Sequence, residues 1–424
     1  MKHALTAAAL VMSIAACGGG SPAGNKEELL VWVDNTRTAA AQEYARAHRD
    51  QNIRVVTMPP EAGYVPTKVS LANKTGKGWP DVVFLTNPAE VATLAAPPFD
   101  FAAPLDEVVP ATVRAAFTPG ALDACAFGGR LYCLRNDVAP TVLWYDAALM
   151  KEFGYQVPKT WQEYTKLGER VAKEHPGHLI GTINGKYGAG VFFASSGCPT
   201  RDARSLSEVR IDVRDPSCVR VAQALQPLTA NKTVTTMSPT DPAFAKLGQS
   251  GKILMLPGPA WFGDFLFKPS FKLAPGRLAA APMPLWEGDD RPYSGQVGGG
   301  VFVVSKHAGQ RTKAAADLVT WLTTDQKLQA RQPTFPAHGP SAQAWGEAKA
   351  ADPFYAENPV PVLTEAARNM RQGFGFVRYE AAWQSSFNEI VVAAVTAGEP
   401  LAGALPDWQD RLAQAATATG YTVK

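Results

Sequence analysis

The residue best placed for chemistry in this sequence is a tryptophan that follows a turn. Trp261 comes directly after the segment 257–260 (PGPA), which ends the apolar run KILML. At the mouth of a buried strand, an indole is better placed to line a cleft than to fill a core, and its flat face can stack on the apolar face of a sugar ring. We therefore predict that Trp261, with Phe262 beside it, contacts a ligand.

Polar side chains also follow two apolar runs that indicate buried strands. Asn35 and Arg37 come after ELLVWV, and Asn87 comes after VVFL. The carboxyl ends of parallel strands meet at one edge of a sheet, where open α/β sheets hold their ligands. We predict that these three side chains contact the ligand. For the polar residues after ELLVWV, an equally good interpretation is that Asn35 or Thr36 caps the following helix.

The sequence contains no motif of an esterase or of a zinc protease. GxSxG and HExxH do not occur, and the acidic residues lie mostly in polar helices and turns, whereas a glycan hydrolase needs two carboxylates close together. The run 298–300 is three glycines without phosphate-loop spacing, so we predict that Gly299 lets backbone approach a ligand or another lobe. No CxxC occurs and the six histidines are scattered, so neither a metal nor a cofactor is predicted.

Composition and length indicate an ordinary globular protein of more than one lobe. The chain has 424 residues, of which 46% are hydrophobic and 19% charged, and this length exceeds a single core of usual size. Lysine and arginine together number 41 against 38 acidic residues, and no basic run stands out. Nucleic acid is therefore not an expected partner.

The N-terminal segment has the pattern of an export signal. Residues 1–16 contain Lys2 and His3 followed by a short apolar stretch, which predicts a signal peptide. The residues before Cys17 (IAA) look like a bacterial lipobox, so we predict cleavage before Cys17 and lipidation of that cysteine. Residues 17–27 would then form a flexible tether. Ordinary secretion, with Cys17 incidental, is the alternative.

The other four cysteines predict two disulfides. Cys125 and Cys133 flank AFGGRLY, in which two glycines can form a hairpin turn that brings the cysteines together. Cys198 and Cys218 would close a longer polar loop. Export to an oxidising compartment favours both bonds.

The order of predicted elements indicates an α/β fold with a crossing between lobes. Residues 28–33, 38–48 and 53–58 predict strand, helix and strand, which a right-handed crossover makes parallel. The runs 131–134 and 141–145 predict two short strands, and the charged pair, alanine and proline between them interrupt the pattern. This interruption is typical of a chain that passes from one lobe to the other.

Several of these segments together resemble one protein family. The segments are ELLVWV, WPDVVFL, LYCLRNDVAPTVLWYDAALMKEFGYQVPKTWQEY, SGKILMLPGPAW and GGGVFVVSKHA with KAAADLVTWLTT, in this order along nearly the whole mature chain. They resemble the carbohydrate-binding extracellular solute-binding proteins (family 1) of ABC importers, which include the maltodextrin-binding proteins. The missing acidic pair after VVFL and the two disulfides depart from the maltodextrin type and count against maltose itself.

The resemblance implies a fold and a division of the chain. The fold is the periplasmic-binding-protein type, with two α/β lobes joined by hinge strands and a ligand cleft between them. The implied N-terminal lobe is 28–135 with 294–334, the C-terminal lobe is 140–289 with 340–424, and the hinge crossings are 136–139, 290–293 and 335–339.

The resemblance also implies which residues bind. Asn35, Arg37 and Asn87 match ligand-contacting strand ends, Asp137 matches a hinge-side carboxylate, and Trp261 matches a stacking tryptophan. The C-terminal lobe would contribute Arg378, Tyr379 and Trp383. Phe193, in the aromatic segment 188–196, is a further candidate, with packing in the core as the alternative.

The implied function is capture of a mono- or oligosaccharide by hinge closure and its delivery to the permease of an ABC importer. The protein would be a monomeric lipoprotein outside the cytoplasm, anchored to the bacterial cell membrane, and would break no bond. A surface adhesin without a small-molecule ligand and an exported glycan hydrolase are the alternatives.

Overall fold

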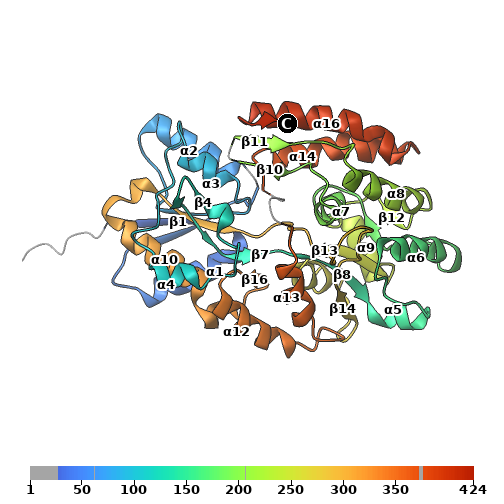
Figure 1. Ribbon diagram of the computed structural model, residues 1–424. Helices are drawn as coiled ribbons and strands as arrows, with labels where there is room; N and C mark the ends of the chain where they lie inside the picture. Colours follow the sequence, from blue (N-terminus) through green and yellow to red (C-terminus); the bar gives the residue numbers. More distant parts are fainter. Residues whose placement is uncertain (1–26, 62, 206, 372–375) are drawn as a thin grey trace, which may run out of the picture.

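The computed structural model describes residues 27–61, 63–205, 207–371 and 376–424. The predicted signal peptide, the lipidation site Cys17 and the tether up to residue 26 lie outside this part of the chain. None of the helices within it is long and apolar enough to span a membrane. The described chain forms two α/β lobes, as predicted, with the blue N-terminal segment in one and the red C-terminal segment in the other (Figure 1).

The N-terminal lobe is built on a five-stranded sheet. β1 lies between β2 and β3 and is parallel to both, as predicted, whereas β15, from late in the chain, is antiparallel to β3 and β6. Every residue of β3 and β15 is buried, which explains their unbroken apolar sequences. The order across the sheet is β2 (Ile53–Thr57), β1 (Leu29–Val33), β3 (Val82–Leu85), β15 (Val301–Val304) and β6 (Leu134–Arg135). The helices of this lobe are α1 (Asn35–Ala47), α2 (Tyr64–Thr75), α3 (Glu90–Ala95), α4 (Ala111–Ala115), α10 (Thr312–Thr324) and α11 (Gln326–Gln329).

The C-terminal lobe contains a three-stranded antiparallel sheet and most of the helices. β8 (Thr141–Asp146) lies between β13 (Met255–Pro259) and β14 (Leu278–Ala281). α6 starts with a capping box, in which Thr160 and Glu163 satisfy each other's backbone N–H groups. The remaining helices are α5 (Ala147–Glu152), α6 (Trp161–Glu174), α7 (Ala189–Ser196), α8 (Pro216–Ala230), α9 (Pro242–Gln249), α12 (Gly339–Ala350), α13 (Val360–Arg368), α14 (Glu380–Ser386), α15 (Ala393–Thr396) and α16 (Leu401–Ala418). Two π-helical segments also lie in the described chain: η2 (Gly263–Phe267), and η4 (Phe387–Val392), which joins α14 to α15.

Three chain segments run side by side between the sheets of the two lobes. The first leaves β6, forms β7 (Asp137–Val138) and enters β8. The second segment contains β16 (Phe335–Pro336), which pairs with β7. The third is 295–300, which forms hydrogen bonds with the first segment; for example, Val297 N–H donates to Ala139 O. This returning segment lies after the predicted crossing 290–293, because Ser294 N–H bonds to Asn369 O in the C-terminal lobe.

Helices α12 and α13 extend the passage between lobes beyond the predicted crossing 335–339. α12 packs against α11 of the N-terminal lobe, and α13 packs against β8 and β14 of the C-terminal lobe. The precise lobe boundaries given above therefore stay a prediction.

Both predicted disulfides are present. Cys125 ends a single helical turn before the hairpin of β4 (Ala126–Phe127) and β5 (Arg130–Leu131), and its bond to Cys133 closes that hairpin. Cys198 follows α7, and its partner Cys218 lies in α8, so the second bond joins two helices of the C-terminal lobe.

Removing either disulfide is expected to lower the free energy of unfolding by roughly 2–4 kcal/mol. The Cys198→Ala/Cys218→Ala pair should lose more than the Cys125→Ala/Cys133→Ala pair, because it opens the longer loop, with a sequence separation of 20 against 8. Urea unfolding of the two double variants measures the difference. Equal stability of both variants and the wild type would contradict the prediction.

Candidate functional site

A cleft of about 800 Å³ lies between the two lobes. Its size is near the upper end of the usual range for ligand sites in proteins. The side chains of the N-terminal lobe that line it include Asp34, Asn35, Arg37, Phe84 and Thr86. Those of the C-terminal lobe include Lys186, Tyr187, Trp261, Phe265, Gln384 and Asn388. Asp137 and Gly298–Gly300 line it from the connecting segments.

The start of α1 places an arginine between two carboxylates. Asp34 caps the helix, with Oδ1 accepting the N–H of Arg37 at 2.9 Å, so the interpretation of Asn35 or Thr36 as the cap is wrong. Arg37 Nη1 lies 3.2 Å from Asp34 Oδ2, and Nη2 lies 3.0 Å from Asp137 Oδ1. The Arg37 charge is therefore already neutralised, while Asn35 remains exposed at the cleft.

Asp137 is the most heavily bonded carboxylate of the cleft. Its Oδ1 accepts hydrogen bonds from Arg37, from Asn136 Nδ2 at 2.7 Å and from Gly300 N–H at 3.1 Å. Its Oδ2 accepts none from the residues that the structure describes. The position of this side chain is thus fixed by both N-terminal and connecting segments, and one oxygen is left for a ligand.

Gly299 makes room for a buried arginine. Arg135 Nε donates to Asp137 O at 2.8 Å, and burial lowers the pKa of Arg135 to about 10, against the opposing effect of the Asp137 charge. A Cβ on Gly299 would lie 2.5 Å from Arg135 Nη2, and the backbone has φ +89° there. The glycine is required by both the space and the conformation.

Trp261 belongs to an aromatic group on the C-terminal wall. Its Nε1 donates to Val297 O at 3.2 Å, and its ring meets Tyr187 and Phe265 edge to face, with centroids 5.2 and 6.0 Å apart. Phe265 is 37% exposed, which is unusual for so large an apolar side chain. These contacts fix the indole ring of Trp261 within an apolar surface on this wall.

The residues of α14 that line the cleft differ from the predicted ones. Tyr379 and Trp383 are buried, and both bond to Thr200, through Tyr379 Oη at 3.0 Å and Trp383 Nε1 at 3.1 Å. They form, with Phe387, an aromatic stripe at four-residue spacing that packs in the core. The next stripe of the same helix lines the cleft, and its members are Glu380, Gln384 and Asn388.

Four other predicted residues also lie away from the cleft. Asn87 is buried, and its Oδ1 accepts Ala89 N–H in the turn before α3. Phe193 packs against Trp408 in the core. Phe262 is fully buried, and a Cβ on Gly258 would lie 2.2 Å from its ring, so it fills the space beside that turn. Arg378 stacks on Tyr421 at 4.2 Å and donates to Gly420 O.

The cleft also contains residues that the sequence analysis missed. They share no motif, and the sequence signal for them is weak: Thr86 follows β3 one position before Asn87, Tyr187 precedes a glycine, and Phe265 is one turn after Trp261. These residues include Asp34, Glu61, Phe84, Thr86, Lys186, Tyr187, Phe265, Glu380, Gln384 and Asn388.

Comparison with known proteins identifies the family. The sequence matches that of the bacterial extracellular solute-binding proteins over residues 33–329, well over half of the chain. The chain belongs to this family.

Relatives of this solute-binding protein include sugar-binding proteins. It is 26% identical over 319 residues to an arabinooligosaccharide-binding protein of Bacillus subtilis (strain 168), which covers 70% of each chain. Among solved structures, the galacto-N-biose-/lacto-N-biose I-binding protein of Bifidobacterium longum, in complex with lacto-N-biose, aligns with a TM-score of 0.78 and 18% identity over 95% of this chain and 100% of that one. The ABC transporter associated binding protein of B. animalis subsp. lactis Bl-04, in complex with β-1,6-galactobiose, aligns with a TM-score of 0.76 and 20% identity over 94% of this chain and 100% of that one. At these identities the two structures bear on the fold alone.

Glu90 of the solute-binding protein lies in a small recess behind the cleft. Burial raises its pKa to about 7, although Gly63 N–H donates to its Oε1 at 2.6 Å and the charge of Lys186 also favours the ionised form. The folded protein therefore binds this proton more tightly than the unfolded chain. The raised pKa of Glu90 therefore adds to the stability of the folded protein below about pH 4.5, the pKa in the unfolded chain. This added stability is lost as the pH rises to about 7.

Glu90→Gln is expected to remove this pH dependence. Relative to the wild type, the variant should gain stability at about pH 8 and not at about pH 4, because glutamine needs no proton to be neutral. Urea unfolding at both pH values measures the effect. Glu107→Gln, at a side chain that is 88% exposed, is the control. A wild-type advantage at pH 8 would contradict the prediction.

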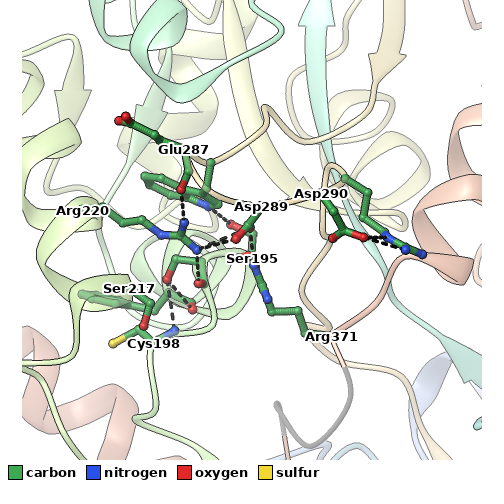
Figure 2. A network of polar contacts seen from close by, with 12 residues as sticks. Ser195, Cys198, Ser217, Arg220, Glu287, Asp289, Asp290 and Arg371 are labelled. Atoms are coloured by element: carbon green, nitrogen blue, oxygen red, sulfur yellow. Dashed lines mark hydrogen bonds and ion pairs between the residues drawn. The ribbon is translucent and has the colours of Figure 1, made fainter.

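A polar network lies at the C-terminal end of α7 (Figure 2). Asp289 is paired with Arg220, at 3.1 Å, and with Arg371. Arg371 Nε also donates to Ser195 O at 2.7 Å, and Arg220 Nη2 donates to Ser196 O. Two arginines thus satisfy the last carbonyls of α7, whose other end leads to the cleft residues Lys186 and Tyr187.

Asp289→Asn is expected to cost about 2 kcal/mol of unfolding free energy, because two partly buried guanidinium groups lose their shared counter-charge. The neighbouring Asp290→Asn is a matched control, since the ion pair of Asp290 with Arg291 lies at the surface, where both side chains are more than half exposed. No measurable loss is expected there. Equal losses in the two variants, measured by urea unfolding, would contradict a special role for Asp289.

Proposed function

We propose that this solute-binding protein captures a neutral mono- or oligosaccharide in the interlobe cleft and releases it unchanged to the permease of an ABC importer. The observation that carries the proposal is the fixed indole of Trp261 on one wall of a cleft that is also lined by carboxylate, amide and hydroxyl groups. Sugars combine apolar ring faces with hydroxyl groups, and this lining suits both.

The charges of the cleft favour a ligand without net negative charge. Four carboxylates line it, from Asp34, Glu61, Asp137 and Glu380, against the two cations Arg37 and Lys186. Arg37 is already paired with two of the carboxylates. An acidic or phosphorylated sugar would meet an excess of negative charge and is disfavoured.

The names of the relatives support a carbohydrate of more than one unit. They include an arabinooligosaccharide-binding protein and structures with lacto-N-biose and β-1,6-galactobiose. A cleft of about 800 Å³ has room for such ligands.

Binding by both lobes favours the closed state, since a ligand shifts the equilibrium by its difference in affinity between the two states. Delivery then takes place outside the cytoplasm, with the protein as a monomer held at the membrane by lipid on Cys17. The connecting segments 136–139 and 335–339 are the hinge of this movement.

Isothermal titration against arabinotriose, lacto-N-biose, β-1,6-galactobiose, maltose and a galacturonate dimer tests the proposal. We expect binding of at least one neutral sugar, none of galacturonate, and no cleavage products. Turnover of a glycan would favour a hydrolase, and the lack of any thermal stabilisation by sugars would favour an adhesin. Detergent partitioning of the wild type and Cys17→Ala, expressed in bacteria, tests the lipid anchor.

A further inference from the structure

Glu380 is a cleft carboxylate with a single, well-defined partner. It lines the cleft from the start of α14, and its side chain is only 10% exposed. Both of its oxygens face one nitrogen, because Arg201 Nη1 lies 3.0 Å from Oε1 and 3.2 Å from Oε2. The pair fixes the carboxylate in relation to the lobe.

Arg201 lies behind the wall and not among the residues that line the cleft. Its side chain is 4% exposed, its guanidinium lies 4.5 Å from the centre of the Trp383 ring, and Nη2 donates to Gly190 O at 3.4 Å. The indole on one face and the carboxylate at one edge leave the guanidinium little freedom. Since Trp383 is itself bonded to Thr200, the pair is anchored in the core of the lobe.

The carboxylate of Glu380 keeps unused acceptor capacity. An ionised carboxylate offers about four acceptor positions, and Arg201 occupies two of them among the described residues. Hydroxyl groups are donors, and their hydrogen bonds to a charged acceptor are roughly twice as strong as those to a neutral one. A buried ion pair contributes little to stability compared with apolar packing, so its presence at a cleft wall points to binding.

We propose that Glu380 binds ligand hydroxyl groups and that Arg201 is the positioning residue that holds its carboxylate at the wall of the cleft. This inference rests on the proposed function and refines it. The cleft then has carboxylates held by an arginine on both sides: Asp34 and Asp137 by Arg37 on one side, and Glu380 by Arg201 on the other. A ligand must present hydroxyl groups to both sides at once, which couples recognition to lobe closure.

The test is a double-mutant cycle on affinity. Titration with arabinotriose, lacto-N-biose and β-1,6-galactobiose compares the wild type, Glu380→Gln, Arg201→Gln and the double variant. Each single variant is expected to bind about 10- to 100-fold more weakly. The double variant should bind no more weakly than Glu380→Gln alone, because Arg201 acts through Glu380.

Two further variants separate binding from folding. Glu380→Asp keeps the charge but withdraws the carboxylate by one methylene, so it should weaken binding without leaving Arg201 unpaired. Glu389→Gln is the matched control: Glu389 follows on the same helical stretch, is 62% exposed at its side chain, pairs with exposed Arg411 at 3.9 Å and is not in the cleft. Its affinity should equal that of the wild type.

Three results would overturn the inference. Wild-type affinity of both Glu380→Gln and Glu380→Asp would show that the carboxylate does not touch the ligand. Additive losses in the double variant would show that Arg201 acts on the fold alone. Failure of the wild type to bind any sugar would remove the proposed function as well, and this outcome is distinguished from the other two by the wild-type titration.

Discussion

Trp261→Ala is expected to weaken carbohydrate binding about 100-fold. The indole ring offers the largest flat apolar surface in the cleft, and losing a stacked sugar ring from it should cost roughly 2–3 kcal/mol of binding free energy. Trp261 is also held in place before the ligand arrives, by its bond to Val297 O and by edge contacts with Tyr187 and Phe265. Little side-chain entropy is therefore lost on binding, and the full stacking energy is available. Isothermal titration measures the loss.

Trp79→Ala is the matched control for this prediction. Trp79 is a half-buried tryptophan of the N-terminal lobe whose Nε1 also donates to a neighbour, Asn73 Oδ1 at 2.7 Å, and whose ring also packs on another, His307. It does not line the cleft. Its removal should lower stability and leave affinity unchanged. Equal affinity losses in the two variants would mean that tryptophan removal acts through the fold and not through stacking.

Strand sequences were sufficient to predict the architecture. ELLVWV and VVFL are nearly unbroken apolar runs, and a strand buried on both faces requires this pattern. The interruption at Arg135–Pro140 predicted the crossing because a charged pair and a proline break the apolar pattern of the strands. In the structure, Arg135 ends β6 in one sheet, and β8 follows in another. The bounds of the crossing 290–293 stay a prediction, since bonds such as that between Ser294 N–H and Asn369 O have no local sequence signal.

Single positions in the site were harder to predict than the segments that contain them. Trp261 and Phe262 are neighbours, as are Thr86 and Asn87, yet one member of each pair lines the cleft and the other is buried. The direction of a side chain at a strand end depends on the turn that follows, which sequence periodicity does not determine.

The helical stretch of α14 and η4 shows that residue spacing can distinguish core positions from cleft positions. Tyr379, Trp383 and Phe387 are aromatic at intervals of four, which is the pattern of a core-facing stripe. The polar stripe one residue later, Glu380, Gln384 and Asn388, then has to face the cleft or solvent. The family resemblance implied that Tyr379 and Trp383 bind the ligand, and these belong to the buried stripe; the polar stripe with the same spacing lines the cleft.

Asp137→Asn is expected to lower the free energy of unfolding by about 3 kcal/mol and to weaken ligand binding as well. The side chain is 3% exposed, and Arg37, Asn136 and Gly300 all donate to one of its oxygens. Loss of the charge leaves the largely buried Arg37 with only one of its two carboxylates, and breaking a buried pair is costly. Asp317→Asn is the control: Asp317 pairs with Lys313 on the surface of α10, is 47% exposed, and should change stability little.

A second substitution separates the charge of Asp137 from its hydrogen bonds to the connecting segment. If the cost arises from unpairing Arg37, then Arg37→Met in the Asp137→Asn background should be less harmful than the sum of the two single changes, because the stranded cation is removed with its partner. If it arises instead from the bonds to Asn136 and Gly300, the two losses should add. Urea unfolding of the four proteins decides between them. A coupled result would mean that the buried charge pair itself joins α1 to the segment that connects the two lobes, so that a ligand bound to Oδ2 of Asp137 would act directly on that segment.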